Sequence, residues 1–222
     1  MTLSVIFDLD GTLIDSAPDI HATANRVMTA RGHAPFTPEE VRSFVGRGAP
    51  VLVARLMAAR QCPVEGPEYD AVLAEFLECY EGAVALTTLY PHVLTALRDL
   101  AAGGARLGIC TNKPLAPTQA VLRHFGMADL FGCVLGGDSL AVRKPDPAPL
   151  LAAAAQLGGG PAVFVGDSEV DAETAERAGL PFLLFTEGYR KALVSALPHA
   201  AAFADFRDLP GLAAGISATA AP

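Results

Sequence analysis

The sequence predicts an α/β protein, with a doubly wound parallel sheet and a small all-helical cap domain inserted after the first strand. Short apolar runs alternate with helix-like stretches along much of the 222 residues, which is typical of parallel strands joined by crossover helices. Two carboxylates follow the first apolar run directly. Residues 17–86 then show no strand-like pattern, which indicates the insertion.

Strands are expected at the short β-rich apolar runs Leu3–Phe7, Arg106–Cys110, Cys133–Leu135, Ala162–Val165 and Phe182–Phe185. Helices are expected between them at Tyr90–Ala102, Ala116–Phe125, Ala148–Leu157 and Asp171–Ala178. Each of these helical stretches is followed by glycine, which commonly ends helices. Because open α/β sheets bind ligands beyond the carboxyl ends of their strands, the polar residues after each strand are the candidates for function.

The inserted stretch carries amphipathic helical patterns, which are interrupted at Pro35–Pro38 and Gly46–Gly48. Thr37 and Glu40 have the spacing of a capping box, with Pro38 at the first helical position. The insertion begins directly after the two carboxylates, so we expect a lid over that site rather than helices that only flank the sheet. The predicted domains are a core of residues 1–16 and 87–222 and a cap of residues 17–86.

The composition excludes several classes of protein. A hydrophobic content of 51% with 18% charged residues predicts a folded core, and a net charge of −8 argues against non-specific binding to nucleic acid. No apolar stretch reaches the length of a membrane span, and the first strand leaves no room for a signal peptide, so we expect a cytoplasmic protein without a membrane partner. The cysteines lack the C-x-x-C spacing of zinc or redox motifs.

The acidic turn after the first strand is the most informative local feature. Asp8 and Asp10 stand at the end of a buried run, where neighbouring carboxylates are costly unless a cation or a shared proton compensates them. The turn therefore predicts a metal ion, a chemical step, or both; the alternative is a solvated acidic turn before a helix. Asp15 and Ser16 are expected to close the turn and cap the next helix.

Polar motifs also follow later strands, at Thr111-Asn112-Lys113, Arg143-Lys144-Pro145 and Gly166-Asp167-Ser168-Glu169-Val170-Asp171. With Asp8-x-Asp10-Gly11-Thr12 they form a set whose order and spacing resemble the haloacid dehalogenase superfamily along nearly the whole chain. Any one of these motifs is weak alone, whereas the complete set in sequence is specific.

The residue types suit a phosphate monoester, which needs cations and oriented donors around its negative charge. Lys144 offers a point charge, and the Thr111 hydroxyl and the N–H groups near Asn112 offer donors. The resemblance adds Gly11 and Thr12 to this phosphate-binding set. It also implies a Mg²⁺ ion, which prefers oxygen ligands, held by Asp8, the backbone carbonyl of Asp10 and Asp167, with Asp171 orienting the ligands.

The resemblance further implies a phosphatase that works through an aspartyl-phosphate. Asp8 is expected to be the nucleophile, and Asp10 to protonate the departing oxygen and then to activate water. Dehalogenases and phosphonate-cleaving relatives lack an Asp at the position of Asp10, which disfavours those reactions here.

Arg47 is the candidate for substrate choice. Flanked by Gly46 and Gly48, it could reach the site on closure and pair bidentately with a carboxylate; the alternative is a solvated turn residue. With the helical lid and Gly188-Tyr189, this loop makes the sequence similar to phosphoglycolate phosphatases, which implies that 2-phosphoglycolate is hydrolysed to glycolate and phosphate.

Several alternatives remain open from the sequence. Inorganic pyrophosphatases, β-phosphoglucomutase-like phosphoryl transferases and sugar phosphatases share this type of lid, and a binding protein with a retired site is a further possibility. Lys113 either favours the potential of the phosphate pocket or is solvated, and His21 is either a substrate contact or a surface residue of its helix. The expected partner is a small phosphorylated metabolite, and the chain is expected to be a monomer or a homodimer.

Overall fold

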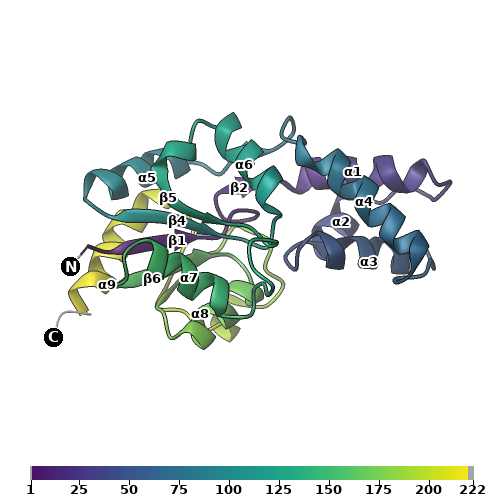
Figure 1. Cartoon of the computed structure of the whole chain (residues 1–222). Helices are drawn as coiled ribbons and strands as arrows, with labels where there is room; N and C mark the ends of the chain where they lie inside the picture. The colour runs from purple at the N-terminus through teal and green to yellow at the C-terminus, as the bar shows by residue number, and fades with distance from the viewer. Residues whose placement is uncertain (1, 220–222) are drawn as a thin grey trace.

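The computed structural model describes residues 2–219, and in that range the main sheet has six parallel strands (Figure 1). In spatial order the strands are β5 (Phe131–Leu135), β4 (Arg106–Cys110), β1 (Ser4–Phe7), β6 (Ala162–Gly166), β7 (Phe182–Phe185) and β8 (Ala201–Phe203). The next strands along the chain, β4 and β5, lie on one side of β1, and the later strands β6, β7 and β8 lie on the other side. The strand order therefore reverses beside β1. The predicted doubly wound α/β fold is confirmed.

The register of the sheet brings the chemically interesting strand ends together. Phe7, at the end of β1, lies opposite Ile109 of β4 on one side and Val165 of β6 on the other. The residues that follow these strands therefore emerge next to one another at the carboxyl edge. A reversal of strand order at this edge leaves a crevice that suits a ligand.

Helices cover both faces of the sheet (Figure 1). One face carries α5 (Val93–Ala102), α6 (Leu115–His124) and α9 (Leu209–Thr219), and the other carries α7 (Ala148–Gln156) and α8 (Glu169–Ala178). The short 3-10 helices are η1 (Ala128–Leu130), η2 (Val194–Ala196) and η3 (Phe206–Asp208). No helix within residues 2–219 is both long and apolar enough to cross a membrane.

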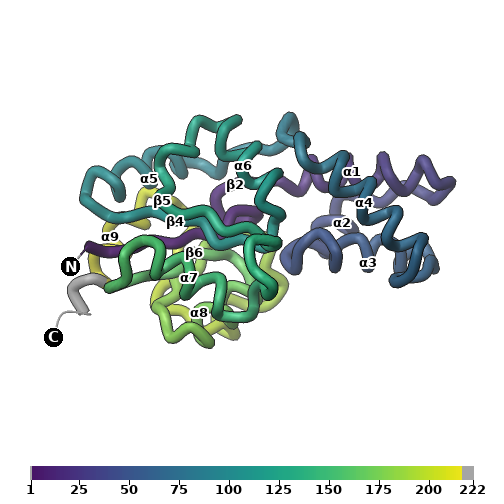
Figure 2. Tube along the Cα trace, in the orientation of Figure 1, coloured from purple at the N-terminus to yellow at the C-terminus, as the bar shows by residue number. Residues whose placement is uncertain are grey.

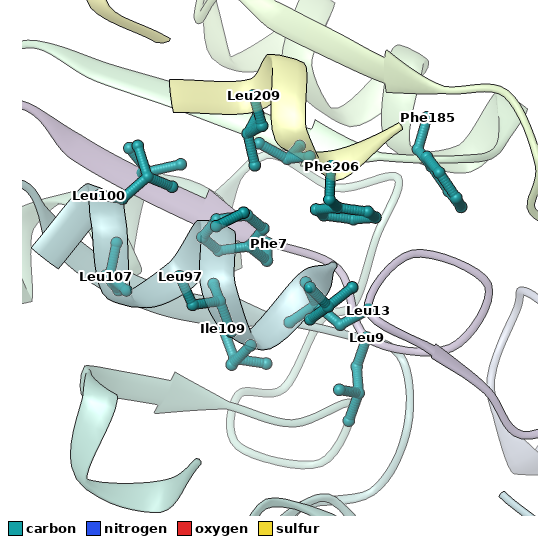
Figure 3. Packing of buried hydrophobic residues seen from close by; sticks show 14 of the residues in the cluster. Phe7, Leu9, Leu13, Leu97, Leu100, Leu107, Ile109, Phe185, Phe206 and Leu209 are labelled. Atoms are coloured by element: carbon teal, nitrogen blue, oxygen red, sulfur yellow. The ribbon is translucent and has the colours of Figure 1, made fainter. Parts of the chain in front are cut away.

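Strand β1 shows how the sequence encodes the two layers. Its residues are all buried, and successive side chains enter opposite cores, as the two-residue period of a strand requires. Val5 and Phe7 pack toward α5, whereas Ile6 packs toward α7 and α8. Figure 3 shows the first of these cores, with Phe7 between Leu97 and Phe206.

A separate helical group stands beyond the carboxyl edge of the sheet (Figures 1 and 2). It consists of α1 (Ala17–Thr29), α2 (Pro38–Phe44), α3 (Ala49–Ala59) and α4 (Pro67–Glu81). These helices bury their own apolar cluster, which includes Val53, Leu56 and Phe76. The predicted capping box of Thr37 and Glu40 is present at the start of α2.

The chain passes between the sheet and the helical group twice, before α1 and after α4, and these two crossing segments are held together by hydrogen bonds. Strands β2 (Ile14–Asp15) and β3 (Thr88–Leu89) pair antiparallel beside them. Asp19, buried in the first turn of α1, accepts hydrogen bonds from the Leu86 N–H at 3.0 Å and the Thr87 hydroxyl at 2.6 Å. A single carboxylate thus links the outgoing and the returning segments.

Candidate functional site

The acidic turn after β1 is built around a glycine that cannot be replaced without a clash. Gly11 has a φ of +86°, and a Cβ at this position would lie 2.6 Å from Asp167 Oδ2. Only glycine combines this backbone conformation with so close an approach. The turn therefore sets Asp8 and Asp10 directly beside the loop that follows β6. The Gly11 N–H itself donates to the carbonyl of Ile14 at 2.8 Å.

Asp167 is held in a fixed orientation by donors from both ends of the chain. The Thr12 hydroxyl donates to its Oδ1 at 2.8 Å, and the Tyr189 N–H donates to its Oδ2 at 2.6 Å. The carboxylate is 1% exposed. Burial, together with the charges of Asp171 and Asp8, raises the pKa of Asp167 well above its usual range.

Asp171 is positioned by the first turn of α8. Ser168 caps this helix, and Asp171 Oδ2 accepts hydrogen bonds from the Ser168 N–H at 3.1 Å and its hydroxyl at 2.6 Å. The other oxygen, Oδ1, lies 2.6 Å from Lys144 Nζ. Asp171 therefore joins the cap of α8 to the buried lysine.

Lys144 is a buried cation between two carboxylates. Its ammonium lies 2.6 Å from Asp171 Oδ1 and 3.0 Å from Asp8 Oδ1, and the residue is 2% exposed. Burial alone would lower the pKa of Lys144, but the attraction of Asp171 and Asp8 outweighs it and raises the pKa above its ordinary value. Lys144 therefore stays charged at neutral pH.

The acidic cluster of Asp8, Asp167 and Asp171 fits a divalent cation. Oxygen atoms of the three carboxylates lie within 4.8 Å of one another. One ammonium, that of Lys144, forms ion pairs with this cluster. When all three carboxylates are ionised, two of their negative charges therefore stay unbalanced. Burial raises the pKa of Asp8 to about 6 in the absence of a metal ion, with Lys144 opposing the rise and Asp171 adding to it. Among the described residues, Asp8 Oδ1 receives no hydrogen bond of acceptable geometry despite its ion pair. A hard cation with oxygen ligands would satisfy this oxygen and balance the charge.

Thr111 and Asn112 follow β4 and border the same crevice. The Thr111 hydroxyl accepts the Lys113 N–H at 3.2 Å, and the Asn112 amide donates to the carbonyl oxygens of Lys144 and Gly46 at 3.0 and 3.1 Å. Asn112 thus links the phosphate-binding candidates to the helical group. Together with Asp8 and Asp10, both residues line a pocket beneath that group.

This cap pocket has a polar floor and mostly apolar walls. The helical group contributes Ile20, Val45, Ala49, Leu52 and Phe76 to its walls, together with Tyr80. The floor is formed by Asp8, Asp10 and the Thr111-Asn112-Lys113 loop. Arg47 is exposed and does not line the cap pocket; it borders an adjoining pocket that also reaches Asp8, Asp10 and Asp167.

The surroundings of Asp10 differ from the sequence expectation. Ser16 was expected to cap α1, but its hydroxyl donates to Asp10 Oδ1 at 2.5 Å and makes no capping bond. The backbone explains the difference, because Ser16 has φ −98° and ψ −3° rather than the extended conformation that capping requires. Lys113 Nζ also lies 3.2 Å from Asp10 Oδ1 and donates to the Tyr80 hydroxyl.

Arg42, on α2 of the helical group, lies against Tyr189 of the sheet domain. The Arg42 guanidinium donates to the Gly188 carbonyl at 3.0 Å and stacks 4.7 Å from the centre of the Tyr189 ring. The Tyr189 hydroxyl accepts the N–H groups of Ser16 and Ala17 at 2.9 and 3.0 Å and donates to Asp15 at 2.7 Å. Tyr189 therefore connects the first crossing segment to Asp167, whose carboxylate its N–H contacts.

His21 lies outside this network. Its Nε2 is 2.9 Å from the carbonyl oxygen of Phe36 and 2.9 Å from the Asn25 amide, both within the helical group. These contacts support a structural role in holding the segment before α2 against α1. The cap pocket is lined by its neighbour Ile20 instead.

Comparison with known proteins extends the geometric findings. The model of the family "Hydrolase: haloacid dehalogenase-like hydrolase" matches residues 4–179. A phosphoglycolate phosphatase of Rhodobacter capsulatus is 51% identical over 215 residues, which cover 97% of this chain and 98% of that protein. One of Rhodospirillum rubrum is 43% identical over 216 residues, with coverages of 94% and 90%. The crystal structure of a predicted phosphoglycolate phosphatase from Haemophilus somnus 129pt has a TM-score of 0.88 and 31% identity, and covers 94% of this chain and 96% of that chain.

Proposed function

Because this chain belongs to the haloacid dehalogenase-like hydrolase family, we propose that it is a Mg²⁺-dependent phosphatase that hydrolyses 2-phosphoglycolate to glycolate and phosphate. The observation that carries the proposal is the cluster of Asp8, Asp167 and Asp171 at the carboxyl edge of the sheet, with a buried ammonium between Asp8 and Asp171. The names of the relatives support the substrate.

In the first step Asp8 is the nucleophile. One of its carboxylate oxygens attacks phosphorus, the bond between phosphorus and the ester oxygen breaks, and the departing oxygen takes a proton from Asp10. Lys144 favours this step because its charge lies 3.0 Å from Asp8 and offsets the negative charge of the incoming ester. The products of the step are glycolate and an aspartyl-phosphate on Asp8.

In the second step water releases the phosphate. Asp10, now ionised, takes a proton from a water molecule whose oxygen attacks phosphorus, and the bond to Asp8 breaks. This returns Asp8 as a carboxylate and Asp10 in its protonated form. The contacts of Asp10 with Ser16 and Lys113 support this role, because they hold its carboxyl group in one orientation, and the Lys113 ammonium favours the ionised form that accepts the proton from water.

The residues proposed to hold Mg²⁺ are Asp8, Asp167 and the backbone carbonyl of Asp10, with Asp171 orienting the others through Lys144 and the cap of α8. When bound, the ion supplies positive charge that offsets the charge of the phosphoryl group. Thr111 and the N–H groups near Asn112 are the proposed phosphate donors. Gly11 and Thr12, which the resemblance added to this set, have N–H groups that donate to the carbonyl oxygens of Ile14 and Leu9 instead, so they are proposed to shape the turn. Residues 17–86 are proposed to form a cap that excludes water from the reaction.

A panel of phosphate esters tests the proposal. We expect release of phosphate from 2-phosphoglycolate at a kcat/KM at least about tenfold above that for glucose phosphates, nucleotides and pyrophosphate. We expect a chelator to abolish the reaction and added Mg²⁺ to restore it, because the acidic cluster repels an anionic ester when no cation balances it. Phosphate is measured colorimetrically, with and without the chelator.

Other results of the same assay would point elsewhere. Activity that survives chelation would contradict the metal-dependent mechanism. Phosphate transfer to an added sugar phosphate, without prompt stoichiometric release to water, would identify a mutase. The absence of release from every ester would favour a binding protein.

Arg47 is proposed to contact the carboxylate of the substrate when the cap closes, and Arg47→Ala tests this role. Because Arg47 is exposed and outside the cap pocket, we expect a loss in kcat/KM of about tenfold or less for 2-phosphoglycolate. The kcat/KM for 2-hydroxyethyl phosphate, which has a neutral hydroxymethyl group in place of the carboxylate, should change less than about twofold. Equal effects on both esters would reject a specific contact.

A further inference from the structure

The cap pocket contains a buried cation that the proposed mechanism does not use for phosphate. Lys113 is 4% exposed and lines the pocket on the side of Asp10. Its ammonium is held by the helical group, because Nζ donates to the Tyr80 hydroxyl and lies 4.1 Å from the centre of the Tyr80 ring. A buried ammonium at this position is costly to maintain and is correspondingly fixed in place.

Lys113 differs from Lys144 in how much of its charge is matched. Lys144 faces two carboxylates, Asp8 and Asp171, whereas the ion pairs of Lys113 within the described residues include one, Asp10. An ammonium group has three N–H donors, and the contacts with Asp10 and Tyr80 use two of them. One donor of Lys113 is therefore available to a ligand in the pocket.

The position of Lys113 matches the leaving-group side of the reaction. Asp10 gives its proton to the departing oxygen, so the leaving group must pass beside the Asp10 carboxyl, which lies 3.2 Å from Lys113 Nζ. In 2-phosphoglycolate a single methylene group separates the carboxylate from that oxygen. The remaining walls of the pocket are largely apolar and would disfavour an unpaired carboxylate.

We propose that Lys113 binds one oxygen of the leaving-group carboxylate inside the cap pocket, which leaves the other oxygen to Arg47, and that Lys113 is a specificity-determining residue for phosphate esters of small carboxylic acids. The inference rests on the proposed phosphatase function and deepens it. Tyr80, which belongs to α4, positions the ammonium, so recognition of the carboxylate requires the helical group to be docked on the sheet.

The test is Lys113→Met, which keeps the length of the side chain and removes its charge. We expect the ratio of kcat/KM for 2-phosphoglycolate to kcat/KM for 2-hydroxyethyl phosphate to fall by about 10- to 100-fold, the factor for one charge-assisted hydrogen bond. The lost contact with Asp10 affects both esters alike and cancels in the ratio. A fall of less than threefold would overturn the proposal and leave Lys113 as a positioning residue for Asp10.

Binding measurements separate recognition from chemistry. In an Asp8→Asn background with Mg²⁺ present, we expect Lys113→Met to weaken the binding of 2-phosphoglycolate by a similar factor and that of inorganic phosphate by less than threefold. Equal losses for both ligands would contradict a leaving-group contact. Lys113→Gln replaces Lys113→Met if the latter does not fold, as judged by thermal unfolding.

Arg123→Met is the matched control, because it removes one positive charge from the exposed end of α6, outside the cap pocket. We expect it to leave the ratio of the two kcat/KM values within threefold of wild type. If the wild-type protein hydrolyses neither ester, the proposed phosphatase function fails whatever the Lys113 variants do. If the wild type is active and the Lys113→Met ratio is unchanged, the function stands and the inference about Lys113 alone is wrong.

Discussion

Asp8→Asn is expected to abolish turnover of 2-phosphoglycolate, with a loss in kcat of at least about 10⁴-fold. The amide has nearly the shape of the carboxylate but cannot form the aspartyl-phosphate bond. Phosphate release in steady state measures the effect, and mass spectrometry after a rapid quench looks for phosphate on the protein. The exposed Asp129→Asn, on η1, is the control and should keep kcat within about twofold.

The same variant is expected to be at least as stable as wild type when no metal is bound. Burial raises the pKa of Asp8 from 3.8 to about 6, so the folded state binds the proton more tightly than the unfolded state does. The metal-free wild type therefore loses stability as the pH rises from about 4 through about 6. An amide has no such titration, so the gain in unfolding free energy at pH 7.5 should reach up to about 3 kcal/mol and should shrink at pH 5.

Urea unfolding in the presence of a chelator, at both pH values, measures this gain. If Asp8→Asn is less stable than wild type at pH 7.5, ionisation of Asp8 does not lower the unfolding free energy of the metal-free protein, and the prediction is wrong. Significant turnover by Asp8→Asn would exclude Asp8 as the nucleophile, whatever the stability result.

Lys144→Met is expected to lower both activity and stability. Removing the ammonium leaves Asp8 and Asp171 buried without their partner, and the unfolding free energy of the metal-free protein should fall by about 3–5 kcal/mol. The kcat/KM should fall by at least about 10³-fold, because the charge that offsets the phosphoryl group during attack is lost. Urea unfolding and phosphate release measure the two effects.

Lys113→Met is the matched control for the stability effect, since it also removes a buried lysine. Lys113→Met leaves one carboxylate unpaired, that of Asp10, whereas Lys144→Met also leaves Asp171 unpaired, whose side chain is 0% exposed. We therefore expect a smaller loss of stability than for Lys144→Met. Added Mg²⁺ should stabilise Lys144→Met more than wild type, because the cation balances a cluster that has lost its ammonium. Equal stabilisation of both proteins would argue that the ion binds elsewhere.

The sequence predicted the main strands of the sheet because their apolar runs are long enough to show a pattern. β4 and β7 were predicted with the bounds found, and β1, β5 and β6 within two residues at either end. Strands β2, β3 and β8 have only two or three residues, too few to show a period. Helix α9 was missed because Pro210, Gly211 and Gly215 are poor helix formers, and packing of Leu209 and Ala213 on the core overrides this preference.

The candidate site was predictable where each residue follows a strand and unpredictable where contacts come from the helical group. Parallel strands bring their carboxyl ends together, so Asp8, Thr111 and Asp167 could be expected at one edge. Tyr80 lies on α4, far from any strand end, and no local signal indicated its contact with Lys113. Ser16 was misassigned because a serine before a helix usually caps it, whereas here Asp10 competes for the hydroxyl.

The bonds of Asp19 to Leu86 and Thr87 bear on how such enzymes could be recombined. The outgoing and the returning segments share the buried carboxylate of Asp19. A chimera that exchanges only one of these segments would therefore leave that carboxylate buried without its hydrogen-bond donors. A chimera that exchanges the helical group for that of another hydrolase therefore needs both splice points on the sheet side of Asp19 and Thr87, so that the two residues are transferred together. The helical group is thus exchangeable as a whole, together with both of its crossing segments, and not one crossing at a time.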